Sequence, residues 1–428
     1  MSEVEQVTSA VAAGCPVAHW FDPTDTSAHP DPFPWYHRLR QEGPVVFAPS
    51  IGMYAVSRHK EVLEILRDTT TYSNVEGLGE FRPLPAAVRA EVGEDWAFAD
   101  FTQAGLTVMD PPQHTRLRKL VAPALTPRRM AVHEAMIREI ADARIDEFVS
   151  HGHADLASQY AYRIPNLVIG RIIGAEDEVS DRFVEWVDAF FRLRLSEMPE
   201  QEEIQCWRSL VEYDRFCRAL IESRRRNPQN DLTTDLICAQ DEDGGPKLTD
   251  EQILGLTIGW IGAGAETSAV MIVNTLQLLL SNRQQWEAIQ ADPTLIPGAV
   301  EEALRLRSPL RGIVRVVTRD TELGGVQIPR GARVYWTMAS ANHDEDRFGA
   351  DSATYDIRRK DREEHVSFGK WAHFCIGAPL ARMEGRIAVQ ALAERLPGLR
   401  LAPDYERDFG YEDNLVLPAV KALRVEWD

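Results

Sequence analysis

The sequence predicts a mainly α-helical protein with a small β-rich region. Apolar residues recur with helical spacing almost continuously from Pro127 to Arg226. A further apolar segment, Thr249–Ser281, begins with a capping pair, Thr249 and Gln252, and would form a helix of about 48 Å. Strand-like runs are short: Ile313–Val317, Val326–Ile328 and Arg333–Met338. Because no repeat or low-complexity linker interrupts these segments, we expect one domain over residues 31–428, preceded by a loosely held, proline-rich arm over residues 1–30.

The elements before residue 127 are predicted to be shorter. They are a helix over Phe33–Glu42, a hairpin over Val45–Ser57 and a helix over Arg58–Arg67. Residues 70–109 show little periodicity, and a segment of this kind is usually functional. Its scattered aromatic residues are Phe81, Trp96, Phe98 and Phe101. Asp110 and two prolines then begin a helix that carries His114 and Arg118.

Composition excludes several classes of protein. With 428 residues, 44% hydrophobic and 26% charged, the chain resembles an ordinary globular protein, and its net charge of −19 argues against a nucleic-acid partner. The five cysteines form no Cys-x-x-Cys pair, so neither a disulfide framework nor a zinc site is predicted. The longest apolar run, Ile253–Ala265, ends at Glu266 and falls short of a bilayer span. We therefore expect a cytoplasmic protein without a membrane anchor.

The middle of the predicted long helix has an unusual composition. Its sequence is Gly259-Trp-Ile-Gly-Ala-Gly-Ala-Glu-Thr-Ser268. Each interior glycine costs a helix about 1 kcal/mol relative to alanine. One explanation is close helix packing, with Glu266 reaching solvent. The alternative is that a flat group lies against this segment while Glu266 and Thr267 handle protons beside it.

A second charged pair lies on the predicted helix Pro297–Leu306. Glu302 and Arg305 are three residues apart, which places both side chains on one face. Alone, they would be read as a surface ion pair. Ser308-Pro309 ends this helix, short strands follow, and a distinctive cysteine lies some seventy residues further along the chain.

That cysteine, Cys375, lies in the stretch His365–Pro379, directly before a predicted helix over Ala378–Arg395. Gly369 and Gly377 flank it and permit positive φ or close backbone approach. A thiol at a helix N-terminus is biased toward thiolate, which is the form that binds metal. The simpler alternative is a buried free cysteine.

Three motifs in this order resemble those of the cytochrome P450 family. They are Phe368-Gly369-x-x-x-His373-x-Cys375-x-Gly377, which resembles the haem-binding loop, Ala263-Gly264-Ala-Glu266-Thr267-Ser268, which resembles the oxygen-binding segment of the long helix, and Glu302-x-x-Arg305. In the family, the last pair contacts an arginine before the cysteine loop, and Arg359 stands at that position. The resemblance covers roughly residues 33–428. The chain departs from the family pattern because it has no proline between Phe348 and Tyr355.

The resemblance implies a triangular prism of helices around haem b, iron protoporphyrin IX, with Cys375 as the axial iron ligand. The residues expected to pair with the haem propionates are His114, Arg118, Arg315 and His373. Those expected to line the haem are Ala263, Gly264, Phe368, Gly369 and Gly377. Thr267 and Glu266 would deliver protons beside the haem, and Glu302, Arg305 and Arg359 would hold the fold around it.

The activity implied is that of a soluble monooxygenase, which inserts one atom of dioxygen into a small organic substrate by hydroxylation or O-dealkylation. Electrons would come from NAD(P)H through a separate reductase and a ferredoxin or flavodoxin. The basic residues expected around the cysteine side, where such a donor would dock, are Arg116, Lys119, Arg128, Arg129, Lys370 and Arg382.

Two alternative functions remain: other haem-thiolate chemistry, such as a peroxygenase, an isomerase or a nitric oxide reductase, and a non-catalytic haem sensor. The Glu266–Thr267 pair argues against the first, and no signalling segment supports the second.

Candidate substrate-pocket residues are Phe190, Leu310, Arg311 and Ile313, together with the 70–109 segment. If the strand at Ile313 is regular and extends back to Arg311, that residue shares the face of Arg315. Arg311 would then either meet an anionic group of the substrate or make a structural contact, through a propionate, a glutamate or the exposed turn.

Overall fold

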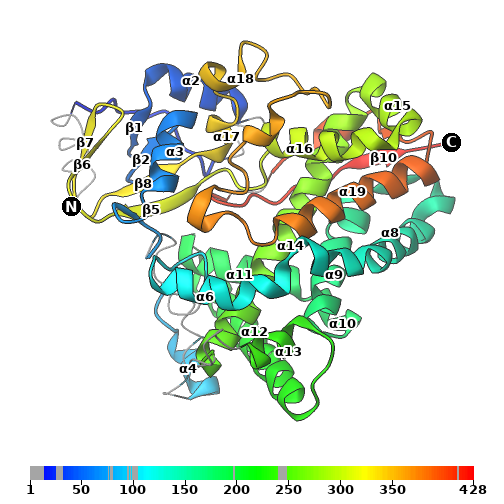
Figure 1. Cartoon of the computed structure of the whole chain (residues 1–428), viewed down its shortest axis with the longest axis horizontal. Coiled ribbons are helices and arrows are strands. Elements are labelled where there is room, and N and C mark those ends of the chain that lie inside the picture. The colour runs from blue at the N-terminus through cyan, green and yellow to red at the C-terminus, as the bar shows by residue number, and fades with distance from the viewer. Residues whose placement is uncertain are drawn as a thin grey trace.

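The computed structural model describes residues 14–25, 32–75, 77, 81–93, 96, 98, 105–195, 198–239, 248–411 and 414–428. Helices form most of it, as predicted (Figure 1). The helices of the larger, helical part are α6 (Gln113–Val121), α7 (Pro127–Met130), α8 (Glu134–Phe148), α9 (Arg163–Ile173), α10 (Asp177–Ser180), α11 (Phe183–Leu195), α12 (Glu200–Arg226), α13 (Leu232–Cys238), α14 (Asp250–Leu280), α15 (Arg283–Ala291), α16 (Ile296–Leu306), α19 (Ala378–Arg395) and α20 (Tyr405–Asp408). Shorter helices accompany the strands or the 70–109 segment: α2 (Phe33–Glu42), α3 (His59–Arg67), α4 (Ala86–Val92), α17 (Met338–Ala341) and α18 (Glu345–Phe348).

The strands form small sheets gathered mainly at one side of the fold (Figure 1). They are β1 (Val45–Ala48), β2 (Met53–Val56), β3 (Tyr72–Ser73), β4 (His153–Asp155), β5 (Ile313–Val317), β6 (Thr321–Leu323), β7 (Val326–Ile328), β8 (Arg333–Trp336), β9 (Arg400–Leu401) and β10 (Arg424–Glu426). The largest sheet has the order β1-β2-β8-β5-β3, in which only the β2–β8 pair is parallel. The predicted hairpin is confirmed, since β1 pairs antiparallel with β2.

The long helix α14 is the central element. The predicted capping box is confirmed, because Thr249 Oγ1 accepts from the Gln252 N–H at 3.2 Å and Gln252 Oε1 accepts from the Thr249 N–H at 3.1 Å. The helix packs on α9, α16 and α19. Among the described residues it is the one helix long and apolar enough to cross a membrane. Within the fold, however, 67% of its apolar window is buried, as expected for a core helix.

Two expectations about the N-terminal quarter need correction. Residues 14–25 are not loosely held: Ala18 and Phe21 are buried, and the Ala18 N–H donates to the Phe47 carbonyl of β1 at 2.9 Å. These apolar side chains fill a small core beside α2 and the sheet. The 70–109 segment contains α4, a helix too short to produce a clear periodicity. Phe101 lies outside the described residues.

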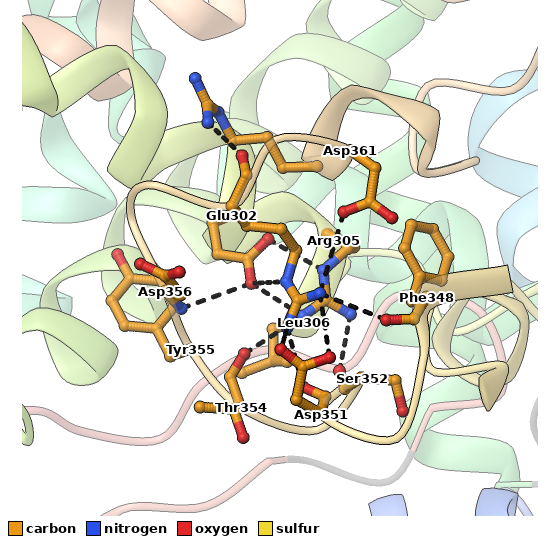
Figure 2. Close-up of polar contacts among 12 residues, drawn as sticks. Glu302, Arg305, Leu306, Phe348, Asp351, Ser352, Thr354, Tyr355, Asp356 and Asp361 are labelled. Carbon is orange, nitrogen blue, oxygen red and sulfur yellow. Dashed lines mark hydrogen bonds and ion pairs between the residues drawn. The ribbon is translucent and has the colours of Figure 1, made fainter.

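A buried ion network joins α16 to the chain that precedes the cysteine loop (Figure 2). Glu302 and Arg305 are fully buried and bond through both carboxylate oxygens, with Arg305 Nε donating at 2.8 Å and Nη2 at 2.7 Å. Arg359 Nε donates to Glu302 Oε1 at 3.0 Å. Arg305 also donates to the carbonyls of Asn342 and Ser352, each at 2.7 Å. One carboxylate thus holds two buried guanidinium groups.

The network reaches the cysteine loop through Asn342. Asn342 Oδ1 accepts from the Val366 N–H at 2.8 Å, and its amide nitrogen donates to Ser367 Oγ at 2.8 Å. Ser367 Oγ in turn donates to the Leu304 carbonyl of α16 at 2.7 Å. The beginning of the loop is therefore fixed to α16 both directly and through Arg305.

Replacing Glu302 by glutamine should strongly destabilise the fold, because it leaves the buried Arg305 without a counter-charge and Arg359 with only the carboxylates of Asp351 and Asp361. We expect a loss of about 3–5 kcal/mol in the free energy of unfolding, measured by urea denaturation. Glu287→Gln is the matched control, since Glu287 makes an exposed i,i+4 pair with Arg283. That change should alter stability by less than about 0.5 kcal/mol. Equal effects of the two variants would contradict this account of the network.

Candidate functional site

Cys375 sits at the entrance to α19 with its sulfur surrounded by hydrogen-bond donors. Its N–H donates to the Phe368 carbonyl at 2.8 Å, which closes the loop. The backbone N–H groups of Gly377 and Ala378 donate to the sulfur. These donors exist because the first N–H groups of a helix lack intrahelical acceptors. The loop thus places the backbone N–H groups of Gly377 and Ala378 near the Cys375 sulfur.

Two opposing effects act on the pKa of the Cys375 thiol. Burial is the larger, and it raises this pKa above its ordinary value. The N–H groups of Gly377 and Ala378 and the charges of Arg118 and Arg382 lower it. The sequence-based expectation of a thiolate considered only this second effect. A metal cation bound to the sulfur would offset the cost of burying its negative charge, so the surroundings fit a metal-bound thiolate.

The two glycines that flank Cys375 serve different purposes. Gly369 has φ of +64°, and a Cβ there would lie 3.3 Å from the His373 carbonyl oxygen. Gly377 has φ of −84°, and a Cβ there would lie 3.9 Å from the cysteine sulfur, which is ordinary contact. The need for a left-handed backbone therefore applies to Gly369 alone.

Cationic and imidazole side chains gather beside the loop: His114 and Arg315 are buried, and Arg118 and His373 are partly buried. The rings of His114 and His373 lie 4.0 Å apart between centroids. Arg118 Nη2 donates to the Phe374 carbonyl at 2.6 Å, and Arg315 Nη1 donates to the Ile65 carbonyl at 2.8 Å. Among the described residues, the two ring nitrogens of His114 and the Nε of Arg315 have no hydrogen-bond partner. The four expected propionate partners are thus close to the cysteine loop, and several of their donors are unused.

The electrostatics of this cluster point to an anionic ligand. Burial and, to a smaller extent, the charge of Arg118 lower the pKa of His114 to about 4. Burial, His114 and Arg315 lower the pKa of His373 to about 3. Burial also lowers the pKa of Arg315 to about 10. Because unpaired buried donors cost free energy, a ligand carboxylate would satisfy them and restore a balance of charge. The cluster fits haem propionates.

The middle of α14 presents a partly open face. Ala263 is exposed although most of the helix is enclosed, and Thr267 Oγ1 donates to the Ala263 carbonyl at 2.6 Å. Glu266 is buried, so the alternative in which it reaches solvent is excluded. Gly264 instead lies against α9, where a Cβ would be 3.6 Å from Ile169 Cδ1. Because that distance is an ordinary contact, helix packing does not by itself require glycine at this position, and Ala263 and Thr267 lie on the partly open face.

Of the four candidate pocket residues, three are apolar: Phe190, Leu310 and Ile313. Phe190 on α11 contacts Phe81 and Phe98, with ring centroids 5.4 Å and 6.3 Å apart. Leu310 and Ile313 are partly buried.

Arg311 precedes β5, which begins at Ile313, so strand alternation does not relate it to Arg315. Its Nη1 donates to the Pro23 carbonyl at 3.2 Å, and its guanidinium lies 5.3 Å from the Tyr411 ring. Arg311 is thus neither exposed in the turn nor paired with a glutamate among the described residues, and its Nη2 is buried there without a hydrogen-bond partner.

Sequence reasoning missed Asn74. Its amide nitrogen lies 2.8 Å from His373 Nε2, and its N–H donates to Asp110 Oδ1 at 3.0 Å. His373 also hydrogen-bonds the Leu106 carbonyl. The loop is therefore tied to the 70–109 segment. No local pattern could have revealed Asn74, because it is separated from His373 by 299 positions.

Comparison with known proteins agrees with this geometry. A family model described as "Cytochrome P450" matches residues 89–396. The chain is 35% identical to the cytochrome P450 monooxygenase PikC of Streptomyces venezuelae, over 93% of this chain and 91% of that protein. It is 32% identical to the steroid C26-monooxygenase of Mycobacterium tuberculosis, over 86% and 87% of the two chains.

Solved structures of cytochromes P450 also match this chain. Cytochrome P450 CREJ in complex with (4-ethylphenyl) dihydrogen phosphate matches with a TM-score of 0.87 at 32% identity, covering 96% of this chain and 100% of that one. The P450 heme domain of Tepidiphilus thermophilus matches with a TM-score of 0.85 at 31% identity, covering 96% and 97%.

Substituting Gly369 by alanine should destabilise the loop, whereas the same change at Gly377 should not. A left-handed backbone costs a residue with a Cβ about 1–2 kcal/mol, and here the added atom also presses on the His373 carbonyl. Thermal unfolding of the two variants, prepared side by side, measures the difference. A Gly377→Ala variant as unstable as Gly369→Ala would mean that crowding around the sulfur, and not backbone conformation, limits both positions.

Proposed function

This chain belongs to the cytochrome P450 family of monooxygenases, and on that premise we propose that it inserts one atom of dioxygen into a small organic substrate. The observation that carries the proposal is the group of buried, partly unpartnered cationic and imidazole side chains beside the Cys375 sulfur. A metal-binding sulfur and anion-binding side chains at one site match the two ends of a haem: its iron and its propionates.

We assign the cofactor as haem b. Cys375 would hold the iron, while Arg118, Arg315, His114 and His373 would hold the propionates. Bound there, haem supplies oxygen activation and oxidation of a substrate C–H bond, which thiolate ligation favours. The backbone donors from Gly377 and Ala378 orient the sulfur and moderate its charge.

Thr267 and Glu266 are proposed to hold and move protons. The Thr267 hydroxyl donates to the Ala263 carbonyl, which leaves its oxygen lone pairs available to accept a hydrogen bond from a ligand or water. Glu266 is buried one residue earlier on α14 and can exchange a proton with such a water. The hydroxyl therefore positions the proton donor, and the carboxyl supplies its proton.

The electron donor is proposed to be a small acidic ferredoxin, reduced by an NAD(P)H-dependent reductase, with a flavodoxin as the alternative. Lys119 and Arg128 are exposed, and Trp371 in the Cys375 loop is 51% exposed. A basic surface with an exposed aromatic residue suits an acidic partner despite the overall negative charge. Arg129 and Arg382 are instead engaged in ion pairs, with Asp235 and Glu301 respectively.

The substrate is proposed to carry an apolar or aromatic part. Phe190, Phe81 and Phe98 form an aromatic group at the junction of α11 and the 70–109 segment. Cytochrome P450 CREJ, whose structure is similar, binds an aryl phosphate. The proposed location is the cytoplasm, which is consistent with five unpaired cysteines.

Replacing Cys375 by alanine should abolish the red-shifted Soret band of the ferrous–CO complex, because that band requires a thiolate ligand. Absorption spectra of the reduced, CO-treated proteins provide the measurement. Cys238→Ala is the control, since Cys238 is an exposed cysteine on α13, outside the site, and should leave the band intact. A band that persists without Cys375 would overturn the proposed ligand.

Thr267→Ala should uncouple electron use from product formation. We expect substrate-induced spectral shifts to remain, while product formed per NADH falls by about tenfold and peroxide rises, because proton delivery is impaired. Thr275→Val is the control, since Thr275 makes the same hydroxyl-to-carbonyl bond on α14 but is fully buried. Unchanged coupling in Thr267→Ala would assign proton delivery to another group.

A further inference from the structure

A second carboxylate on α16, that of Glu301 directly before Glu302, binds His365 at the start of the cysteine loop and Arg382 on the helix that follows the loop. Glu301 accepts from Arg382 through both oxygens, from Nε at 2.8 Å and from Nη2 at 2.5 Å. His365 Nε2 lies 2.9 Å from Glu301 Oε1. Glu301 and His365 are buried, whereas the Arg382 side chain is 39% exposed. The fork of the guanidinium is thus held in one orientation.

This orientation places the Arg382 charge on the cysteine loop. The guanidinium lies 4.6 Å from the centroid of the Phe368 ring. The Phe368 carbonyl accepts the Cys375 N–H, so the residue on which Arg382 stacks is hydrogen-bonded directly to Cys375. The positive charge of Arg382 stabilises the thiolate form of Cys375.

We propose that the fixed positive charge of Arg382 raises the electron affinity of the Cys375 centre. A fixed positive charge near the sulfur favours a centre that gains an electron. Glu301 has the opposite direct effect, because its negative charge disfavours reduction, although it secures the arginine. The inference rests on the proposed haem-thiolate function.

The contacts separate Arg382 from the other basic residues around the loop. Its guanidinium is bound by a buried carboxylate and stacked on a phenyl ring, although the side chain remains 39% exposed. Glu301 is held ionised, since the hydrogen bonds from Arg382 and His365 lower its pKa to about 2 despite burial. The pair therefore persists throughout the working pH range. A role in docking the electron donor does not require a guanidinium fixed by a buried carboxylate.

The experiment measures the midpoint potential of the haem-loaded full-length protein in Arg382→Gln, Glu301→Gln and Arg382→Lys. At a fixed potential, the ratio of ferrous to ferric protein should fall by about threefold in Arg382→Gln and rise by a smaller factor in Glu301→Gln. Arg382→Lys retains the charge without the fork and should lie between wild type and Arg382→Gln. Arg386→Gln is the matched control, because Arg386 lies one turn further on α19 and pairs with Glu134 at 2.8 Å.

Opposite shifts in the two main variants support charge tuning, since loosening of the loop alone would move both in the same direction. Same-direction shifts, or an equal shift in Arg386→Gln, would overturn the proposal. Unchanged potentials with slower reduction by ferredoxin at low salt would make Arg382 a docking residue and also overturn it. The ferrous–CO band is recorded first: its absence in wild type refutes the proposed function itself, whereas a normal band with unmoved potentials refutes only the role of Arg382.

Discussion

The buried pairing of Glu302 with Arg305 and Arg359 is the constraint on which the site depends. Two guanidinium groups share the buried Glu302 carboxylate, and Arg305 has no other carboxylate partner among the described residues, so losing Glu302 leaves the charge of Arg305 uncompensated. Arg305 donates a hydrogen bond to the Asn342 carbonyl. The side chain of Asn342 in turn binds the Val366 N–H and the Ser367 hydroxyl at the start of the cysteine loop. The position of the loop thus follows from electrostatics on α16 and not from the loop's own few apolar contacts.

Helix α16 holds the cysteine loop from both ends. Successive residues of a helix project about 100° apart, so the adjacent carboxylates Glu301 and Glu302 reach different partners. Glu302 fixes the segment that leads into the loop, and Glu301 binds Arg382 on the helix that leads out of it. A clamp of this kind would suit the metal ligand proposed at Cys375, because it holds the sulfur in place.

Local features were predictable from the sequence, whereas long-range pairings were not. The capping box of α14 and the shared face of Glu302 and Arg305 depend on residues three apart, so their patterns are visible in the chain. Contacts such as Asn74 with His373 or Arg311 with Pro23 join distant segments whose meeting depends on the whole fold. The placement of Gly264 against α9 illustrates the same limit: a motif identifies a helix, but only packing decides which way each residue faces.

Some of the departures from ordinary packing rules lie at the site. His114 and Arg315 keep buried donors without partners among the described residues, and Gly369 and Trp371 adopt positive φ within the loop. The unpaired donors and the positive φ of Trp371 cost stability in the protein alone. A ligand that brings carboxylates to the donors and a cation to the sulfur removes the electrostatic part of that cost. Binding and stability are therefore linked: the strain concentrated around Cys375 becomes part of the affinity for the cofactor.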